Sequence, residues 1–276
     1  MPWDNGLYEV WLGFALVFGC CIGSFLNVCI WRIPLGESVV FAPSHCPKCG
    51  HHIRWYENIP LISYLGLRGK CSQCRQPITI RYFLVELLTG LLFVGAFAVS
   101  AELPLPLPAL ALSAGLIMMA LPAAFIDVEH RLIPNKLTCP MMVFAVLVAW
   151  LEPAWWQEDS RWAAAVWSIG SGLAAWAVMA ALAWLGRRIF KAEALGGGDV
   201  KFIAAVAAAT GWQGALVTLT VGSFLGTLYG IGLMIRQWKS RKDWKRLTVP
   251  FAPFLAVGVY VWMTLGRYCY ELLLVR

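Results

Sequence analysis

Long apolar runs separated by polar loops make up most of this chain. Several runs have roughly 20 apolar residues and few charges, the length that a helix needs to cross the hydrocarbon core of a bilayer. The pattern predicts an all-α polytopic membrane protein with about eight transmembrane helices. The predicted spans are residues 10–30, 83–101, 109–126, 137–151, 162–186, 200–210, 214–235 and 247–265.

The composition indicates the same class of protein. Hydrophobic residues are 60% of the 276 residues, charged residues are 13%, and the mean hydropathy is +0.68. A soluble domain of this composition would expose large apolar patches. Residues 1–10 contain no Lys or Arg and so lack the basic start of a cleavable signal peptide. We therefore expect the first span to remain in the mature protein.

The charge pattern predicts how the spans are oriented. Most of the 22 Lys and Arg residues fall in alternate loops, which the positive-inside rule places in the cytosol. The net charge of +7 is then explained by topology and by attraction to anionic lipids. We expect membrane lipids as partners and no nucleic acid. The basic loops are residues 32–81, 131–136, 187–201 and 236–246.

The largest polar loop, about residues 35–80, has the cysteine spacing of a metal site. Cys46 and Cys49 form one CxxC pair, and Cys71 and Cys74 form a second pair 21 residues further along. Four thiolates in two close pairs match a tetrahedral structural zinc site. The pattern predicts a small cytosolic zinc-binding loop domain.

Two alternatives remain for this loop. The cysteines could form disulfides or stay as free thiols, although the reducing cytosol makes disulfides the weaker interpretation. His45, His51 or His52 could also replace a cysteine as a ligand. Four cysteines already complete a closed site, so we expect the histidines to be surface residues.

Two aspartates stand where apolar runs meet basic loops. Asp127 ends the third predicted span, and Asp199 closes a GxGD run that starts at Gly196 and includes Gly198. An acidic residue at a membrane edge indicates a functional site. Two carboxyl groups in one site can divide acid and base roles, because like charges a few ångströms apart do not both ionise cheaply. We expect an acid/base dyad of aspartates with Gly196, Gly198 and Lys201 as its supporting loop.

Other interpretations of this segment stay open. Asp199 could act only as a helix N-cap, and Lys201 could either tune the dyad or anchor the span at the lipid headgroups. Other protease classes have no support, because the chain contains neither an HExxH helix nor a GxSxG elbow.

These motifs together resemble the type IV prepilin peptidases, bifunctional leader peptidases and N-methyltransferases with a GxGD aspartic site. A GxGD run alone would be weak support, but the motifs occur in order over most of the chain. They are GSFLNV (23–28), RIP (32–34), the CxxC pairs, WYENIPLISYL (55–65), RGKC (68–71), RYFLVELLTG (81–90), the Asp127 segment with IPN (133–135), and GGGDVK (196–201).

The resemblance implies cleavage of type IV prepilins and of pseudopilins of type II secretion, after a Gly and before a Phe, at the cytosolic face of the bacterial inner membrane. It also implies N-methylation of the new amino terminus with S-adenosylmethionine as methyl donor. Residues 1–100, with two spans and the zinc loop, would carry methyl transfer. Residues 101–276, with six spans, would form the GxGD peptidase domain.

The chain has no strand-GxGxxG-helix motif for the methyl donor, so methyl transfer depends on the resemblance alone. Residues that could lie near the donor are Gly23, Asn27, Arg32 and Glu86. Glu86 could instead hold the zinc loop or pair with Arg81. Two other functions remain: a peptidase without methyl transfer, and a non-enzymatic scaffold that docks a secretion or pilus assembly through its zinc loop.

Overall fold

The chain is described by a computed structural model that covers residues 6–40, 44–102, 106–190, 195–238 and 249–266. Helices dominate these ranges, and the extended pairs within them are two isolated bridges. The prediction of an all-α protein is confirmed. The chain divides into two compact units, Met1–Pro104 and Leu105–Arg276, and each is described by itself.

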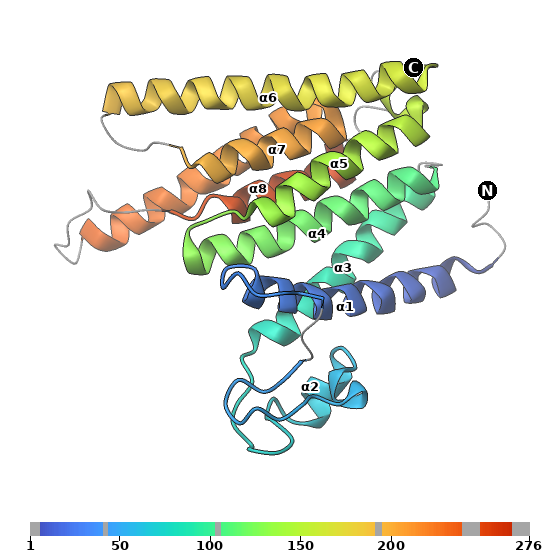
Figure 1. Cartoon of the computed structure of the whole chain (residues 1–276), viewed down its shortest axis with the longest axis vertical. Coiled ribbons are helices and arrows are strands. Elements are labelled where there is room, and N and C mark those ends of the chain that lie inside the picture. Colours follow the sequence, from blue (N-terminus) through green and yellow to red (C-terminus); the bar gives the residue numbers. More distant parts are fainter. Residues whose placement is uncertain (1–5, 41–43, 103–105, 191–194, 239–248, 267–276) are drawn as a thin grey trace. The chain divides into compact units, whose positions relative to one another are not determined.

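The first unit is built on two long apolar helices, α1 (Tyr8–Arg32) and α3 (Arg81–Glu102), which pack side by side (Figure 1). Between them the chain forms the four-cysteine loop, with short helices η1 (Trp55–Asn58) and α2 (Ile62–Gly66). Glycine allows close packing, because a Cβ on Gly23 would lie 2.7 Å from the Cα of Glu86. Small residues at such crossings are typical of helix pairs in lipid.

The second unit is a helical bundle around α7, which consists of two helical segments that meet at Gly211. This element packs against α6, α8 and α5, while α4 packs against α8 and α5. A short π-helical turn, Trp262–Gly266, follows α8. The elements are α4 (Leu107–His130), α5 (Asn135–Leu151), η2 (Pro153–Trp156), α6 (Arg161–Phe190), α7 (Gly197–Trp238) and α8 (Ala252–Val261).

The predicted number of spans is not confirmed. In the described parts, α1, α3, α4, α6 and α7 are long and apolar enough to cross a membrane, and the apolar α5 and α8 are shorter. The chain is therefore a membrane protein, but a count of eight spans is not established. Two predicted spans, 200–210 and 214–235, fall within α7, which loses helical geometry at Gly211 (φ 73°, ψ −175°).

Parts of several other predictions lie outside the described residues, including residues 41–43 of the predicted four-cysteine loop. Residues 247 and 248 of the last predicted span belong to these parts. Residues 191–194 of one predicted basic loop and residues 239–246 of another also belong to them.

The contact between α1 and α3 predicts a packing defect on enlarging Gly23. Gly23→Val should destabilise the protein by about 1–3 kcal/mol, because the new methyl groups would overlap the α3 backbone. Gly13→Val is the matched control, because a Cβ on Gly13 meets nothing within 4 Å. Thermal unfolding in detergent measures both, and equal midpoints for the two variants would contradict this packing.

Candidate functional site

The four cysteines of the first unit lie on two turns of similar design. The N–H of Cys46 donates to the His51 carbonyl at 2.8 Å, and the N–H of Cys71 donates to the Gln76 carbonyl at 2.9 Å. The turns pass through left-handed positions at Gly50 (φ 72°) and Arg75 (φ 59°). Each turn folds its CxxC pair back on itself, so both sulfurs of a pair face the other pair.

The sulfur atoms of Cys46, Cys49, Cys71 and Cys74 lie within 4.8 Å of one another. In a tetrahedron with metal–sulfur bonds of about 2.3 Å, neighbouring sulfurs are about 3.8 Å apart. The sulfurs of Cys46 and Cys74 are 3.9 Å apart, which is close to that value and far too long for a disulfide. The four cysteines, all free thiols, can therefore hold one metal ion such as zinc.

The backbone of the second turn favours the thiolate form that a metal binds. The N–H groups of Cys74 and Gln73 donate to the Cys71 sulfur and lower the pKa of that thiol to about 6. Metal ligation requires deprotonated cysteine. The turn thus prepares a ligand for the ion.

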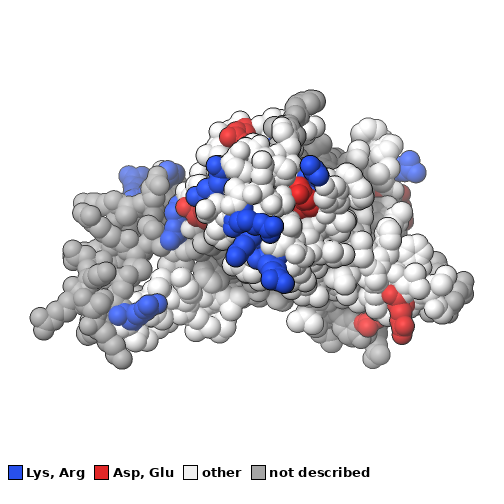
Figure 2. Space-filling model, turned by 90° about the horizontal axis from the view of Figure 1, so that it is seen from below, with Lys and Arg blue, Asp and Glu red and all other residues white. Residues whose placement is uncertain are grey.

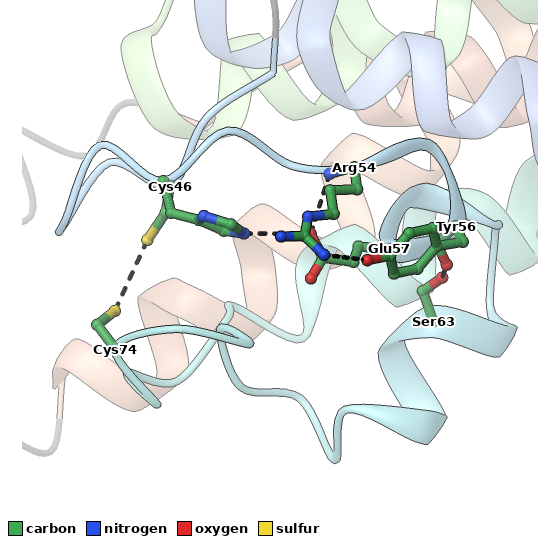
Figure 3. A network of polar contacts seen from close by, with 7 residues as sticks. Cys46, Arg54, Tyr56, Glu57, Ser63 and Cys74 are labelled. Carbon is green, nitrogen blue, oxygen red and sulfur yellow. Dashed lines mark hydrogen bonds and ion pairs between the residues drawn. The ribbon is translucent and has the colours of Figure 1, made fainter.

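A polar network beside the cluster engages one of the candidate histidines (Figure 3). The ring of His51 contacts Glu57 at 3.2 Å, and Glu57 also accepts the Arg54 N–H at 2.9 Å. The Arg54 contact, followed by one with Ser72, lowers the pKa of the Glu57 carboxyl. Ser63 donates to the Tyr56 carbonyl at 2.8 Å and so joins α2 to η1. The side chain of His51 therefore supports the loop beside the metal ligands.

The surface of the four-cysteine loop is basic. Figure 2, viewed from the side where Figure 1 shows this loop, has Lys and Arg side chains gathered near its centre. An excess of basic groups suits a loop that faces an anionic lipid surface. The exposed basic residues of the loop are Lys48, Arg54, Arg68, Lys70 and Arg75.

The candidates for binding the methyl donor have internal contacts in the first unit. Gly23 packs on the α3 backbone. Asn27 donates from Nδ2 to the Tyr82 carbonyl at 3.0 Å, and Arg32 donates from Nη1 to the Ser38 carbonyl at 3.2 Å. These contacts hold the unit together and do not outline a donor pocket. The assignment of these residues to the methyl donor stays a prediction.

Glu86 forms a hydrogen bond with the four-cysteine loop, as one of its predicted roles requires. Its Oε2 accepts the Leu61 N–H at 2.8 Å, and the Ser24 hydroxyl also hydrogen-bonds its carboxyl group. The carboxyl group is buried between α1 and α3. Leu61 is a partner that the sequence did not indicate.

In the second unit, Asp127 lies in the last turn of α4 and is only 8% exposed. Its Oδ2 accepts the N–H of Ala252, the first residue of α8, at 2.9 Å. The backbone N–H groups at a helix N-terminus are free to donate, so the start of α8 supplies a hydrogen-bond donor to this carboxyl group. Sequence reasoning missed this partner, since 125 residues separate the two positions.

Asp199 lies in the first turn of α7, two residues after the helix begins at Gly197. Its side chain reaches back to the Gly196 backbone, which hydrogen-bonds the carboxyl group. Asp199 is thus the third residue of the helix and not its N-cap, in the position of the acidic residue of a capping box. The capping contact and a catalytic role are compatible, because one carboxylate oxygen suffices for the cap.

Two contacts bring the start of α7, where Asp199 lies, to the segment that follows Asp127. A Cβ on Gly198 would lie 2.9 Å from the Cβ of Ile133, so only a residue without a side chain fits there. Lys201 donates from Nζ to Oδ1 of Asn135 at 2.9 Å. The start of α7 therefore packs against the turn that follows Asp127, and the charge of Asp127 acts on the Asp199 carboxyl. Lys201 thus links the start of α7 to the start of α5, and its role at the aspartates stays a prediction.

Two family models match the chain. The Bacterial Peptidase A24 N-terminal domain matches residues 17–100, and the Type IV leader peptidase family matches residues 113–231. The four cysteines and Glu86 fall in the first match, and both aspartates fall in the second. No solved structure is significantly similar to the chain.

Curated relatives named prepilin leader peptidase/N-methyltransferase are similar over most of the chain. The protein of Burkholderia pseudomallei (strain 1026b) is 32% identical over 95% of this chain and 88% of its own length. The protein of Stutzerimonas stutzeri is 36% identical over 91% of this chain and 90% of its own length. That of Myxococcus xanthus (strain DK1622) is 40% identical over 80% of this chain, which spans only 63% of that longer relative.

The cysteine cluster predicts bound metal. Cys71→Ser should lower the metal content well below about one ion per chain, because a closed site loses most of its affinity with one ligand. Cys139→Ser is the matched control, since Cys139 is an exposed free thiol on α5 outside the cluster. Elemental analysis of purified protein measures the content. Undenatured wild-type protein that is active without metal would contradict the prediction.

Proposed function

The chain belongs to the family of prepilin leader peptidase/N-methyltransferases, and from this premise we propose that it is a bifunctional membrane enzyme. Its substrates are the precursors of type IV pilins and pseudopilins. It cleaves the leader after a Gly and before a Phe, and then methylates the new amino terminus. The observation that supports the proposal is the position of Asp127 at the end of α4 and of Asp199 at the start of α7, near enough for an electrostatic interaction between the two.

The dyad provides an acid and a base for peptide hydrolysis. One ionised carboxylate takes a proton from water, whose oxygen then attacks the scissile carbonyl carbon. The other carboxyl group, which is protonated, donates to the carbonyl oxygen. When the tetrahedral intermediate collapses, the C–N bond breaks and the leaving amine takes up a proton. The two carboxyl groups titrate as a pair, so acid and base roles belong to the dyad as a whole.

The surroundings of the dyad support this chemistry. The first N–H of α8 donates to the Asp127 carboxyl group, and the two aspartates are close enough to interact electrostatically. Gly196 carries no side chain over the Asp199 carboxyl group, where a Cβ would lie 2.9 Å from Oδ2, and Gly198 lets the loop pack against Ile133. The hydrogen bond from Lys201 to Asn135 joins the start of α7 to the start of α5.

The four-cysteine loop holds a structural zinc ion in this proposal. Four thiolates fill a tetrahedral coordination shell and leave no open position for water, so zinc stabilises the loop and takes no part in hydrolysis. The second activity uses S-adenosylmethionine, which supplies an electrophilic methyl group when bound. We assign this activity to residues 1–100 and the peptidase to residues 101–276.

The enzyme lies in the bacterial inner membrane with both functional regions at the cytosolic face. The basic loops support this orientation, because Lys and Arg are retained on the cytosolic side. The same side is reducing, which keeps the cysteines available for metal. A peptidase without methyl transfer and a scaffold without catalysis are the alternatives that the two following experiments distinguish.

Loss of either dyad carboxyl group should abolish cleavage. Asp127→Asn and Asp199→Asn should each lower the rate by roughly a thousandfold or more, because an amide can neither accept nor deliver the proton. Glu129→Gln, an exposed carboxylate on α4 two positions after Asp127, is the matched control. Purified variants are assayed on a prepilin in liposomes. Near-normal cleavage by either variant would remove that aspartate from the mechanism, and cleavage by both would favour the scaffold.

Cleavage and methylation should occur in a fixed order. Only the freshly exposed amine can attack the methyl donor, so Asp199→Asn should leave a full-length precursor unchanged. The same variant should still methylate a pre-cleaved pilin, which gains about 14 Da per methyl group by intact mass. If wild-type protein cleaves but never adds this mass with the donor present, the chain is a peptidase only.

A further inference from the structure

Glu86 is a buried carboxylate on α3 that the proposed cleavage does not use. It is 8% exposed, and its Oε2 accepts the N–H of Leu61 at 2.8 Å. The Ser24 hydroxyl of α1 also bonds its carboxyl group. A carboxylate among apolar helices is retained only when hydrogen bonds compensate for its lost hydration. One side chain thus ties α1 and α3 to the middle of the four-cysteine loop.

The loop residue that Glu86 holds has a strained backbone. Leu61 has φ 60° and ψ −49°, and the N–H of Ile62 donates to the Pro60 carbonyl at 2.6 Å. This is a γ-turn of the rare kind with positive φ at its centre, which residues with a Cβ avoid. Strain of this sort persists where surrounding contacts over-determine the conformation. The hydrogen bond from Leu61 to Glu86 is one of these contacts.

The helices α1 and α3 are closely packed on the membrane side of this contact. A Cβ on Gly23 would lie 2.7 Å from the Cα of Glu86, so α1 touches α3 at this position. One turn earlier on α3, the ring of Phe83 packs on Tyr64 of α2 with centroids 5.5 Å apart. Residues three apart share a helix face, so Phe83 and Glu86 present one docking face to the loop.

We propose that Glu86 is a positioning residue that holds the four-cysteine loop in a fixed pose on α1 and α3, and that methyl transfer requires this pose whereas cleavage does not. The inference rests on the proposed assignment of methyl transfer to this unit. The role needs a hydrogen-bond acceptor at position 86. It does not require a negative charge at this position, and it does not depend on the four cysteines.

The experiment compares Glu86→Ala, which removes the acceptor, with Glu86→Gln, which keeps one. Glu102→Ala is the matched control, because Glu102 is an exposed carboxylate at the other end of α3. Each purified full-length variant is examined in lipid nanodiscs by hydrogen exchange and by zinc analysis. Cleavage of a prepilin and methylation of a pre-cleaved pilin with S-adenosylmethionine are measured separately.

For Glu86→Ala, we expect amide exchange in residues 59–66 to become faster by about tenfold or more. The methylation rate should fall by about tenfold or more, while the cleavage rate and the zinc content should stay within about twofold of wild type. Glu86→Gln should retain methylation and slow exchange, because its amide oxygen accepts the Leu61 N–H. Glu102→Ala should behave as wild type.

Several outcomes would overturn the inference. They are unchanged exchange or near-normal methylation in Glu86→Ala, an equal loss of cleavage, and a Glu86→Gln variant as impaired as Glu86→Ala. The wild-type protein gives an independent test if Glu86→Ala does not fold. Its Leu61 amide should exchange about tenfold or more slowly than an unstructured amide, and exchange at the unstructured rate would refute the contact. Wild-type protein that never methylates would count against the proposed function, while exchange still tests the contact.

Discussion

The cost of burying a carboxylate among apolar helices shapes both units of this protein. A buried charge without partners costs several kcal/mol, so each such group must meet hydrogen-bond donors. Asp127 finds the first N–H of α8, 125 residues further along the chain, and Glu86 finds the N–H of Leu61, 25 residues earlier. Each carboxylate is a long-range tie as well as a charge. The positions of α8 and of the four-cysteine loop depend on these ties.

Glycine makes both carboxylate environments compact. Gly23 lets α1 lie against the α3 backbone at Glu86, and Gly198 lets the start of α7 lie against Ile133, just beyond Asp127. A side chain at either position would push two backbones apart. The neighbouring carboxyl group would then lose the close packing around it. The motifs that contain these glycines therefore describe packing requirements as much as chemistry.

The four-cysteine loop has a different source of stability. Its short helices expose Trp55, Ile62 and Leu65, so few apolar side chains remain to form a core. The four cysteines can hold a metal ion that joins the two turns, and such an ion would contribute folding free energy that a small core cannot supply. The contact of Glu86 with Leu61 acts on another part of the loop. Metal binding shapes the loop internally, and the carboxylate sets its place on the helices.

The sequence by itself determined the helical membrane class and the approximate ranges of α1, α3 and α4. It also identified the two CxxC motifs as one candidate metal site and the two aspartates as candidate functional residues. Apolar periodicity, cysteine spacing and the GxGD run are local signals, and they report local structure. The tertiary structure alone decided the partners of those residues: Ala252 for Asp127, Asn135 for Lys201, and Leu61 for Glu86. It also decided the geometry at Gly211, where the backbone leaves the helical conformation between the segments that contain the predicted spans 200–210 and 214–235. Partners so far apart in the chain meet only when helix ends pack together, and no local pattern records which ends will meet.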